Sequence, residues 1–185
     1  MPTSGDSVDL TDVHRLTEQC TDAFRLETLP QYLVPGEDER FSAWKRGERL
    51  RRTLKNNEWL AELKGLTAAG ERWWRVRILD YPLVPYSAYE LFGYQDSATA
   101  GQETFVADRA WHADLADLHK DFWIYDSATV VRMVYDEEGH FLRPELRDNV
   151  QHYLDIRDCA LRHAVPLSAY LEKREPDLIA QPVDD

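Results

Sequence analysis

The sequence lacks the features that define several large classes of protein. Its 185 residues include only two cysteines, Cys20 and Cys159, which lie far apart and without the short spacing of a zinc site. This number excludes a disulfide-rich scaffold, and we expect two free thiols in a reducing cytoplasm. No run of apolar residues approaches the roughly 18–20 that a membrane span needs, so we expect no membrane association. The eight glycines are scattered and form no phosphate-binding loop.

Motifs for catalysis are equally scarce. No two of the six histidines have the helical spacing with an intervening glutamate that marks a metalloprotease. Ser127 lacks the Gly-x-Ser-x-Gly context of a hydrolase nucleophile. His112 and His119 lie with Asp114 and Asp117 in an expected loop, where a metal site is the less favoured interpretation. We therefore predict no metal and no cofactor, and we assign no catalytic residue.

The composition is that of a folded domain. Hydrophobic residues make up 43% of the chain and charged residues 30%, and six Trp, nine Tyr and six Phe supply apolar surface to bury. The first residues show neither the basic nor the apolar stretch of a signal peptide, so we expect a cytoplasmic protein. We predict one domain over residues 9–173, a disordered N-terminus over 1–8 and an acidic flexible tail over 174–185.

The formal net charge of −12 is unevenly distributed along the chain. Residues 40–77 contain eleven basic and four acidic side chains, interleaved with tryptophans, whereas the segments on either side are acidic. Such a segment suits RNA, because arginine binds phosphate and aromatic rings stack on bases. The alternative is that these cations pair with the protein's own carboxylates. Duplex DNA is disfavoured, since the chain is acidic and lacks a helix-turn-helix motif.

The residue pattern predicts an α+β fold, with a mostly antiparallel sheet, N-terminal helices and one long C-terminal helix packed on it. Apolar residues at helical spacing, together with capping residues, predict helices over 9–20 and 37–47, from Asn57, from Ser87 with Glu90 completing a capping box, and over 145–164. Runs rich in β-branched and aromatic residues predict strands over 24–28, 72–79, 103–107, 121–125, 129–135 and 140–142.

The strand over 72–79 carries the main candidate site. Because side chains alternate between the two faces of a strand, Trp73, Arg75 and Arg77 point one way, and the apolar residues between them point toward the core. The first set forms a cationic, aromatic face, which is either a solvated sheet surface or the floor of a ligand site. Tyr86 and Glu90 follow this strand and are placed to approach the same face.

A second strand brings carboxylates to the sheet. Asp121 and Trp123 share one face of the strand over 121–125, whereas Asp126 falls on the other, so the two aspartates form no acid–base dyad. We expect these strand-end carboxylates to pair with Arg75 and Arg77 across the sheet. Each such pair contributes about 0.2–1 kcal/mol.

Several short motifs in a fixed order resemble an actinobacterial family of domains of unknown function, of about this size, over residues 20–165. The motifs are Phe24-Arg25-Leu26-Glu27, Tyr32, Phe41 with Trp44-Lys45-Arg46-Gly47, Arg75-Val76-Arg77, Pro82 with Tyr86, Tyr89-Glu90, Ala100-Gly101-Gln102-Glu103, Asp121-Phe122-Trp123 with Asp126, and Met133-Val134-Tyr135-Asp136 with Gly139. Members of that family are often encoded beside helix-turn-helix regulators. The resemblance therefore implies a regulatory or antitoxin-like interaction role, and it implies no catalytic residues.

We predict a cytoplasmic interaction module that binds a partner protein or an anionic ligand through its Arg- and Trp-rich sheet face. The predicted binding residues are Arg75 and Arg77 for anion recognition, Trp73 and Trp123 for stacking, and Tyr86, Glu90, Asp121 and Asp126 around them. The resemblance suggests a helix-turn-helix regulator as the partner protein. The alternative is a small transferase that acts on an aminoacyl-tRNA or another anionic carrier and holds its phosphates with residues 40–77.

Overall fold

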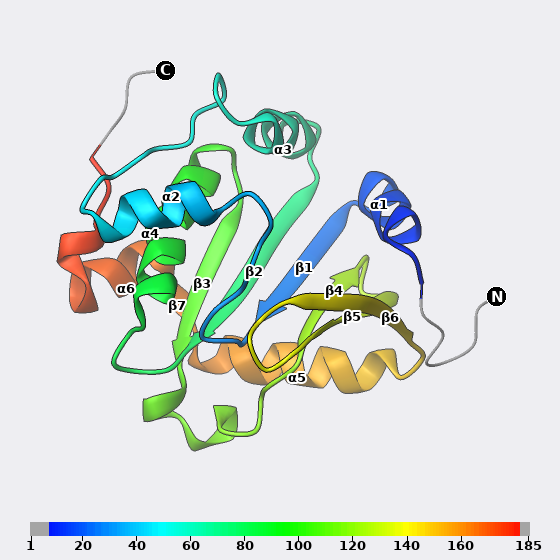
Figure 1. The fold of residues 1–185 in the computed structure, drawn as a ribbon. Coiled ribbons are helices and arrows are strands. Elements are labelled where there is room, and N and C mark those ends of the chain that lie inside the picture. Colours follow the sequence, from blue (N-terminus) through cyan, green and yellow to red (C-terminus); the bar gives the residue numbers. More distant parts are fainter. Residues whose placement is uncertain (1–7, 182–185) are drawn as a thin grey trace.

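The computed structural model describes residues 8–181, which fold into six α-helices around one seven-stranded sheet (Figure 1). The helices are α1 (Leu10–Gln19), α2 (Asp38–Lys45), α3 (Glu58–Ala68), α4 (Pro85–Thr99), α5 (Val150–His163) and α6 (Leu167–Arg174). The strands are β1 (Asp22–Glu27), β2 (Arg72–Leu79), β3 (Glu103–Asp108), β4 (Asp121–Tyr125), β5 (Thr129–Tyr135), β6 (Phe141–Arg147) and β7 (Val165–Pro166).

The sheet has the order β6-β5-β4-β1-β2-β3-β7. Strands β1, β2 and β3 are parallel to one another, and the other four neighbouring pairs are antiparallel, so the prediction of a mostly antiparallel sheet is confirmed. In the centre, Arg25 of β1 lies between Arg75 of β2 and Trp123 of β4. This register gathers the charged side chains of three strands on one face.

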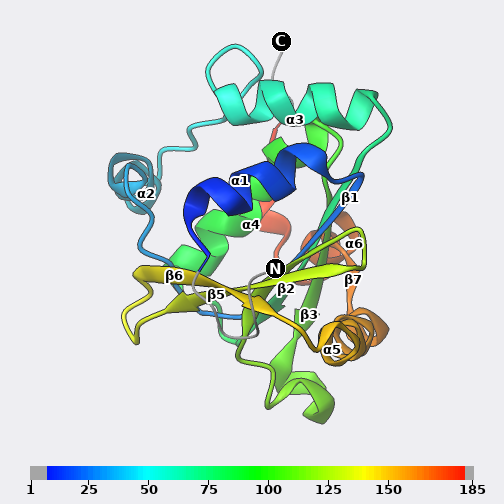
Figure 2. The ribbon, with the colours of Figure 1, turned by 90° about the vertical axis from the view of Figure 1, so that its right-hand side faces the viewer.

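The opposite face of the sheet is apolar and packs against α5. Phe24, Val76, Phe122 and neighbouring side chains of the central strands form one buried cluster with Tyr153 of α5. Figure 2 shows α5 on this side of the sheet, with α1 and α3 on the other. The predicted inward orientation of the apolar residues of β2 is confirmed.

The Arg- and Trp-rich face is covered as well, by α1, α3 and α4. Trp73 packs with Leu60 and Leu63 of α3 in a second apolar cluster at the start of β1 and β2. Toward the ends of these strands the same face carries charged residues, and the side chain of Arg77 has no exposed surface. This face is therefore not a solvated sheet surface.

Two predictions about helices are wrong. The predicted long C-terminal helix over 145–164 is shorter, because β6 extends to Arg147 and α5 begins only at Val150; a separate helix, α6, follows. Ser87 does not cap a helix with Glu90, because α4 begins at Pro85 and the Ser87 hydroxyl donates instead to the carbonyl of Pro30.

Most other helix predictions hold within a few residues, and the predicted cap at Asn57 accepts from the N–H of Leu60 at 3.0 Å. None of the helices over residues 8–181 combines the length and apolar character needed to cross a bilayer. Residues 1–7 of the predicted disordered N-terminus lie outside the described residues. Within the segment predicted as a flexible tail, residues 174–185, the backbone N–H of Ala180 donates to the side-chain oxygen of Gln95 in α4 at 2.8 Å.

Candidate functional site

A polar cavity of about 200 Å³ lies between α4 and the charged part of the sheet face. Its floor comes from β1, β2 and β5, and its other walls come from α4, the 32–37 segment and the side chains of Arg52 and Trp59. Three arginines and three glutamates face it, namely Arg25, Arg52, Arg75, Glu27, Glu37 and Glu90. The cavity is thus lined by equal numbers of opposite charges.

The two predicted arginines of β2 are paired inside the protein. Nη1 of Arg75 donates to Oε2 of Glu27 at 2.9 Å, and Nη2 donates to Gln102 at 2.9 Å. Nε and Nη2 of Arg77 both donate to Oε2 of Glu90, at 3.1 and 2.8 Å. The expectation that strand-end aspartates pair with these arginines is therefore wrong, since glutamates of β1 and α4 do so.

Asp121 instead organises the part of the site next to Arg25. Its Oδ1 accepts from the backbone N–H and the hydroxyl of Thr28, at 2.9 and 2.7 Å. Its Oδ2 accepts from the Tyr32 hydroxyl at 2.5 Å and from Nη2 of Arg25 at 3.3 Å. Tyr135 accepts from the same Nη2 at 3.0 Å. These bonds fix the Arg25 guanidinium, which also lies 5.3 Å from the ring centroid of Trp123.

Two of the arginines that line the cavity each have one guanidinium nitrogen without a hydrogen-bond partner among the described residues. They are Nη1 of Arg25 and Nε of Arg75, and both are buried. The side chain of Arg25 is only 6% exposed. Buried donors are nearly always satisfied, and leaving a charged donor unsatisfied costs more free energy than leaving a neutral one unsatisfied. Two arginines that line the cavity therefore each keep one buried donor without an acceptor.

The carboxylates of the site differ in their affinity for protons. Burial raises the pKa of Glu90 to about 7, in spite of Arg77. Burial also acts on Glu27, but the attraction of Arg75, Arg25 and Arg77 outweighs it and lowers its pKa to about 2. The Tyr94 hydroxyl lies 2.9 Å from Oε2 of Glu27 and 3.2 Å from Oε1 of Glu90. Because it has one proton, it can donate a hydrogen bond to only one of these carboxylates at a time. A proton on Glu90 completes this chain of hydrogen bonds.

The structure brings some of the predicted residues together and separates others. Arg75, Tyr86 and Glu90 line the cavity, and Arg77 and Asp121 lie behind it. Three other predicted residues, Trp73, Trp123 and Asp126, do not line the cavity. Trp73 packs in the apolar cluster with α3, and Trp123 packs between Trp73 and Arg25. Asp126 accepts from the backbone of Thr21 and Asp22 at the opposite end of β1.

Sequence reasoning missed the residues that β1 contributes. Arg25 and Glu27 alternate with Phe24 and Leu26, so the period of two in this short strand already places them on one polar face. Tyr94 was also missed. It follows Glu90 by one helical turn, which is the spacing at which two side chains of a helix meet.

The basic segment over 40–77 is largely bound to the protein itself. Arg51 and Arg52 both pair with Asp96 of α4, whose side chain is 1% exposed. The guanidinium of Arg49 stacks on the ring of Trp44 at 3.6 Å. With Arg75 and Arg77 also paired internally, these contacts favour the interpretation in which the cations neutralise the protein's own carboxylates.

Comparisons with known proteins add a family but no activity. Residues 11–172 match the family model described as Domain of unknown function (DUF6879). No curated protein and no solved structure matches the chain. The predicted resemblance to a family of unknown function is confirmed in this respect, whereas the actinobacterial origin and the gene neighbourhood stay predictions.

Proposed function

The chain belongs to the DUF6879 family, a domain of unknown function, and we propose that it binds a compact oxyanion, a carboxylate or phosphate, in the cavity beneath α4. The observation that carries this proposal is the buried Nη1 of Arg25, which has no acceptor among the described residues. An anionic oxygen would satisfy this donor with a charge-assisted hydrogen bond, which is roughly twice as strong as a neutral one. Arg75 would add its free Nε.

The size of the cavity supports a small ligand. Its volume of about 200 Å³ is below the roughly 300–1,000 Å³ of typical sites for drug-sized molecules. A single small carboxylate or phosphate fits this space better than a nucleotide or a peptide. Five tyrosines, Tyr32, Tyr86, Tyr89, Tyr94 and Tyr135, complete the wall and offer hydroxyls and ring faces to the rest of such a ligand.

A regulatory role through a partner protein, such as a helix-turn-helix regulator, stays a prediction. At this face it is less well supported, because a partner cannot reach Arg77, whose side chain is 0% exposed. The transferase alternative needs surface cations to hold the phosphates of a carrier. It loses support from the internal pairing of Arg51 and Arg52.

Isothermal titration of the full chain with acetate, glutamate, inorganic phosphate and sulfate tests the proposal. At least one of these anions should bind, and Arg25→Gln should weaken it about 10- to 150-fold, the equivalent of one hydrogen bond to a charged group at about 1.5–3 kcal/mol. Arg72→Gln is the matched control, because Arg72 lies on β2 with its side chain 46% exposed and away from the cavity. It should leave the affinity unchanged.

A second variant keeps the test decisive if Arg25→Gln folds poorly. Val34 lines the cavity and is 44% exposed, so Val34→Trp fills the mouth without touching the charged network. It should abolish binding, whereas Leu142→Trp, at an exposed position of β6, should not. An anion that binds Arg25→Gln and Val34→Trp as tightly as wild type would contradict the proposal.

A further inference from the structure

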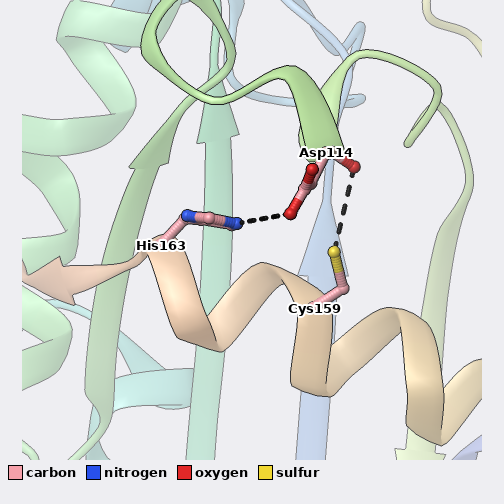
Figure 3. Close-up of side chains that lie close together, drawn as sticks. All are labelled: Asp114, Cys159 and His163. Atoms are coloured by element: carbon pink, nitrogen blue, oxygen red, sulfur yellow. Dashed lines mark hydrogen bonds and ion pairs between the residues drawn. The ribbon is translucent and has the colours of Figure 1, made fainter.

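A second group of reactive side chains lies on the other side of the sheet, where α5 meets the segment between β3 and β4. Cys159 and His163 are four residues apart on α5, so they lie on one face of the helix. Both point toward Asp114, which belongs to a short 3₁₀ helix over Ala113–Leu115 (Figure 3). The sequence spacing alone does not reveal this group, because Asp114 is distant along the chain.

The three side chains lie close enough for one metal ion to reach them after a small movement, although Cys159 Sγ now contacts the backbone carbonyl of Asp114 at 3.8 Å. Nε2 of His163 lies 3.2 Å from Oδ2 of Asp114, and one potential ligand atom from each of the three residues lies within 4.8 Å of the other two. Two nitrogen or oxygen ligands at 2.0–2.1 Å from a tetrahedral ion are about 3.3 Å apart, and a sulfur ligand is about 3.6 Å from either. Each distance from the Cys159 sulfur to the other two ligand atoms therefore has to shorten by at most about 1.2 Å.

The surroundings hold two of the three ligands in place. Leu115, next to Asp114, is fully buried in the cluster beneath α5 and fixes the 3₁₀ helix against it. The His112 ring stacks on His163 at 4.3 Å between centroids, which orients the imidazole. Both histidines also line a cavity of about 220 Å³ next to α6, which Asp114 and Cys159 do not line.

The other group of metal-ligating residue types within residues 8–181 has a different character. Asp136, Glu138 and His140 lie in the turn between β5 and β6. Asp136 already accepts from the backbone N–H groups of Glu138 and His140, at 3.0 and 2.8 Å, and it contacts the His140 ring. These bonds are those of a local turn and explain why the three side chains lie together. The cluster therefore serves as a control in the metal-binding experiment below.

We propose that Asp114, Cys159 and His163 bind a divalent transition metal ion of the zinc type, with a fourth position open to solvent. A thiolate, an imidazole and a carboxylate are the ligand types that zinc takes, and sites with three protein ligands keep an open position. The bound ion ties the segment between β3 and β4 to α5. Binding releases the thiol proton of Cys159, since the thiolate is the ligand.

Cobalt substitution tests this site on the full chain after removal of metal with a chelator. Co²⁺ should bind with a thiolate charge-transfer absorption in the near ultraviolet and a tetrahedral visible spectrum, and Zn²⁺ should displace it. Cys159→Ser should abolish the thiolate band, whereas Cys20→Ser, which removes the other cysteine, should retain it. His163→Gln should weaken Zn²⁺ binding at least about 100-fold, more than the loss of an outer-shell partner typically does.

Other outcomes would overturn the proposal. A thiolate band that survives in Cys159→Ser would place the metal elsewhere. Metal binding without any thiolate band, lost in Asp136→Asn and kept in Asp114→Asn, would assign the ion to the turn between β5 and β6. The absence of Co²⁺ and Zn²⁺ binding to folded wild-type protein would exclude the site altogether.

Discussion

Replacing Arg77 by Gln is expected to destabilise the protein much more than replacing Arg72 on the same strand. The Arg77 side chain is 0% exposed and that of its partner Glu90 is 10% exposed. Removing one member of a buried ion pair leaves the other charge without a partner, which typically costs about 3–5 kcal/mol. Arg72 pairs with Glu103 at the surface, where both side chains are 46% exposed, and such pairs contribute about 0–1 kcal/mol.

Urea denaturation followed by tryptophan fluorescence measures both losses. At pH 8, above the pKa of about 7 for Glu90, Arg77→Gln should lower the free energy of unfolding by about 3–5 kcal/mol. At pH 5 Glu90 holds a proton, and the loss should shrink to the roughly 1–3 kcal/mol of unsatisfied polar groups. The reasoning is refuted if Arg77→Gln costs no more than Arg72→Gln at pH 8, or if its cost is equal at both pH values.

Other consequences can be measured independently. The folded-state pKa of Glu90, about 7, lies above its ordinary value of 4.5. The stability that this group contributes is therefore complete below pH 4.5 and is lost as the pH rises through 7. In urea denaturation, Glu90→Gln should remove this dependence of the free energy of unfolding on pH. Whichever of acetate, glutamate and sulfate binds, each being ionised at both values, should bind more tightly at pH 6 than at pH 8 by up to about tenfold in titration calorimetry, because protonated Glu90 leaves the cavity one positive charge in excess. Gly139→Ala should cost more than about 1 kcal/mol in urea denaturation, because φ is +95° and the added Cβ would lie 2.5 Å from the carbonyl oxygen of Gln31. Asp96→Ala should release the segment it pins, seen as faster trypsin cleavage after Arg52, and unchanged cleavage would contradict this.

The central strands could be predicted from the sequence because their residue types leave one interpretation. The strands over 72–79, 121–125 and 129–135 have the predicted limits. They combine β-branched and aromatic residues with polar or turn-forming residues at their ends. The long helix over 145–164 was wrong because Leu146 fits two patterns. It continues the helical stripe of α5, but in the structure it pairs with Val131 on the neighbouring strand.

The candidate site could be predicted only in part, because its burial depends on distant partners. An alternation of Arg with apolar residues is typical of a half-exposed strand. Here Arg77 is buried because α4 returns over the sheet with Glu90 thirteen residues later. Arg75 is paired with Glu27, which is 48 residues away. No local pattern specifies either distance, so the sequence identifies the arginines but not the cavity beside them.

The most direct measurement is a crystal structure of the full chain with the anion that binds most tightly in the calorimetric series, at saturating concentration. We expect the anion in the cavity beneath α4, with one oxygen within hydrogen-bond distance of Nη1 of Arg25. Water alone in that cavity, with the anion bound at another place on the molecule, would contradict the proposed function.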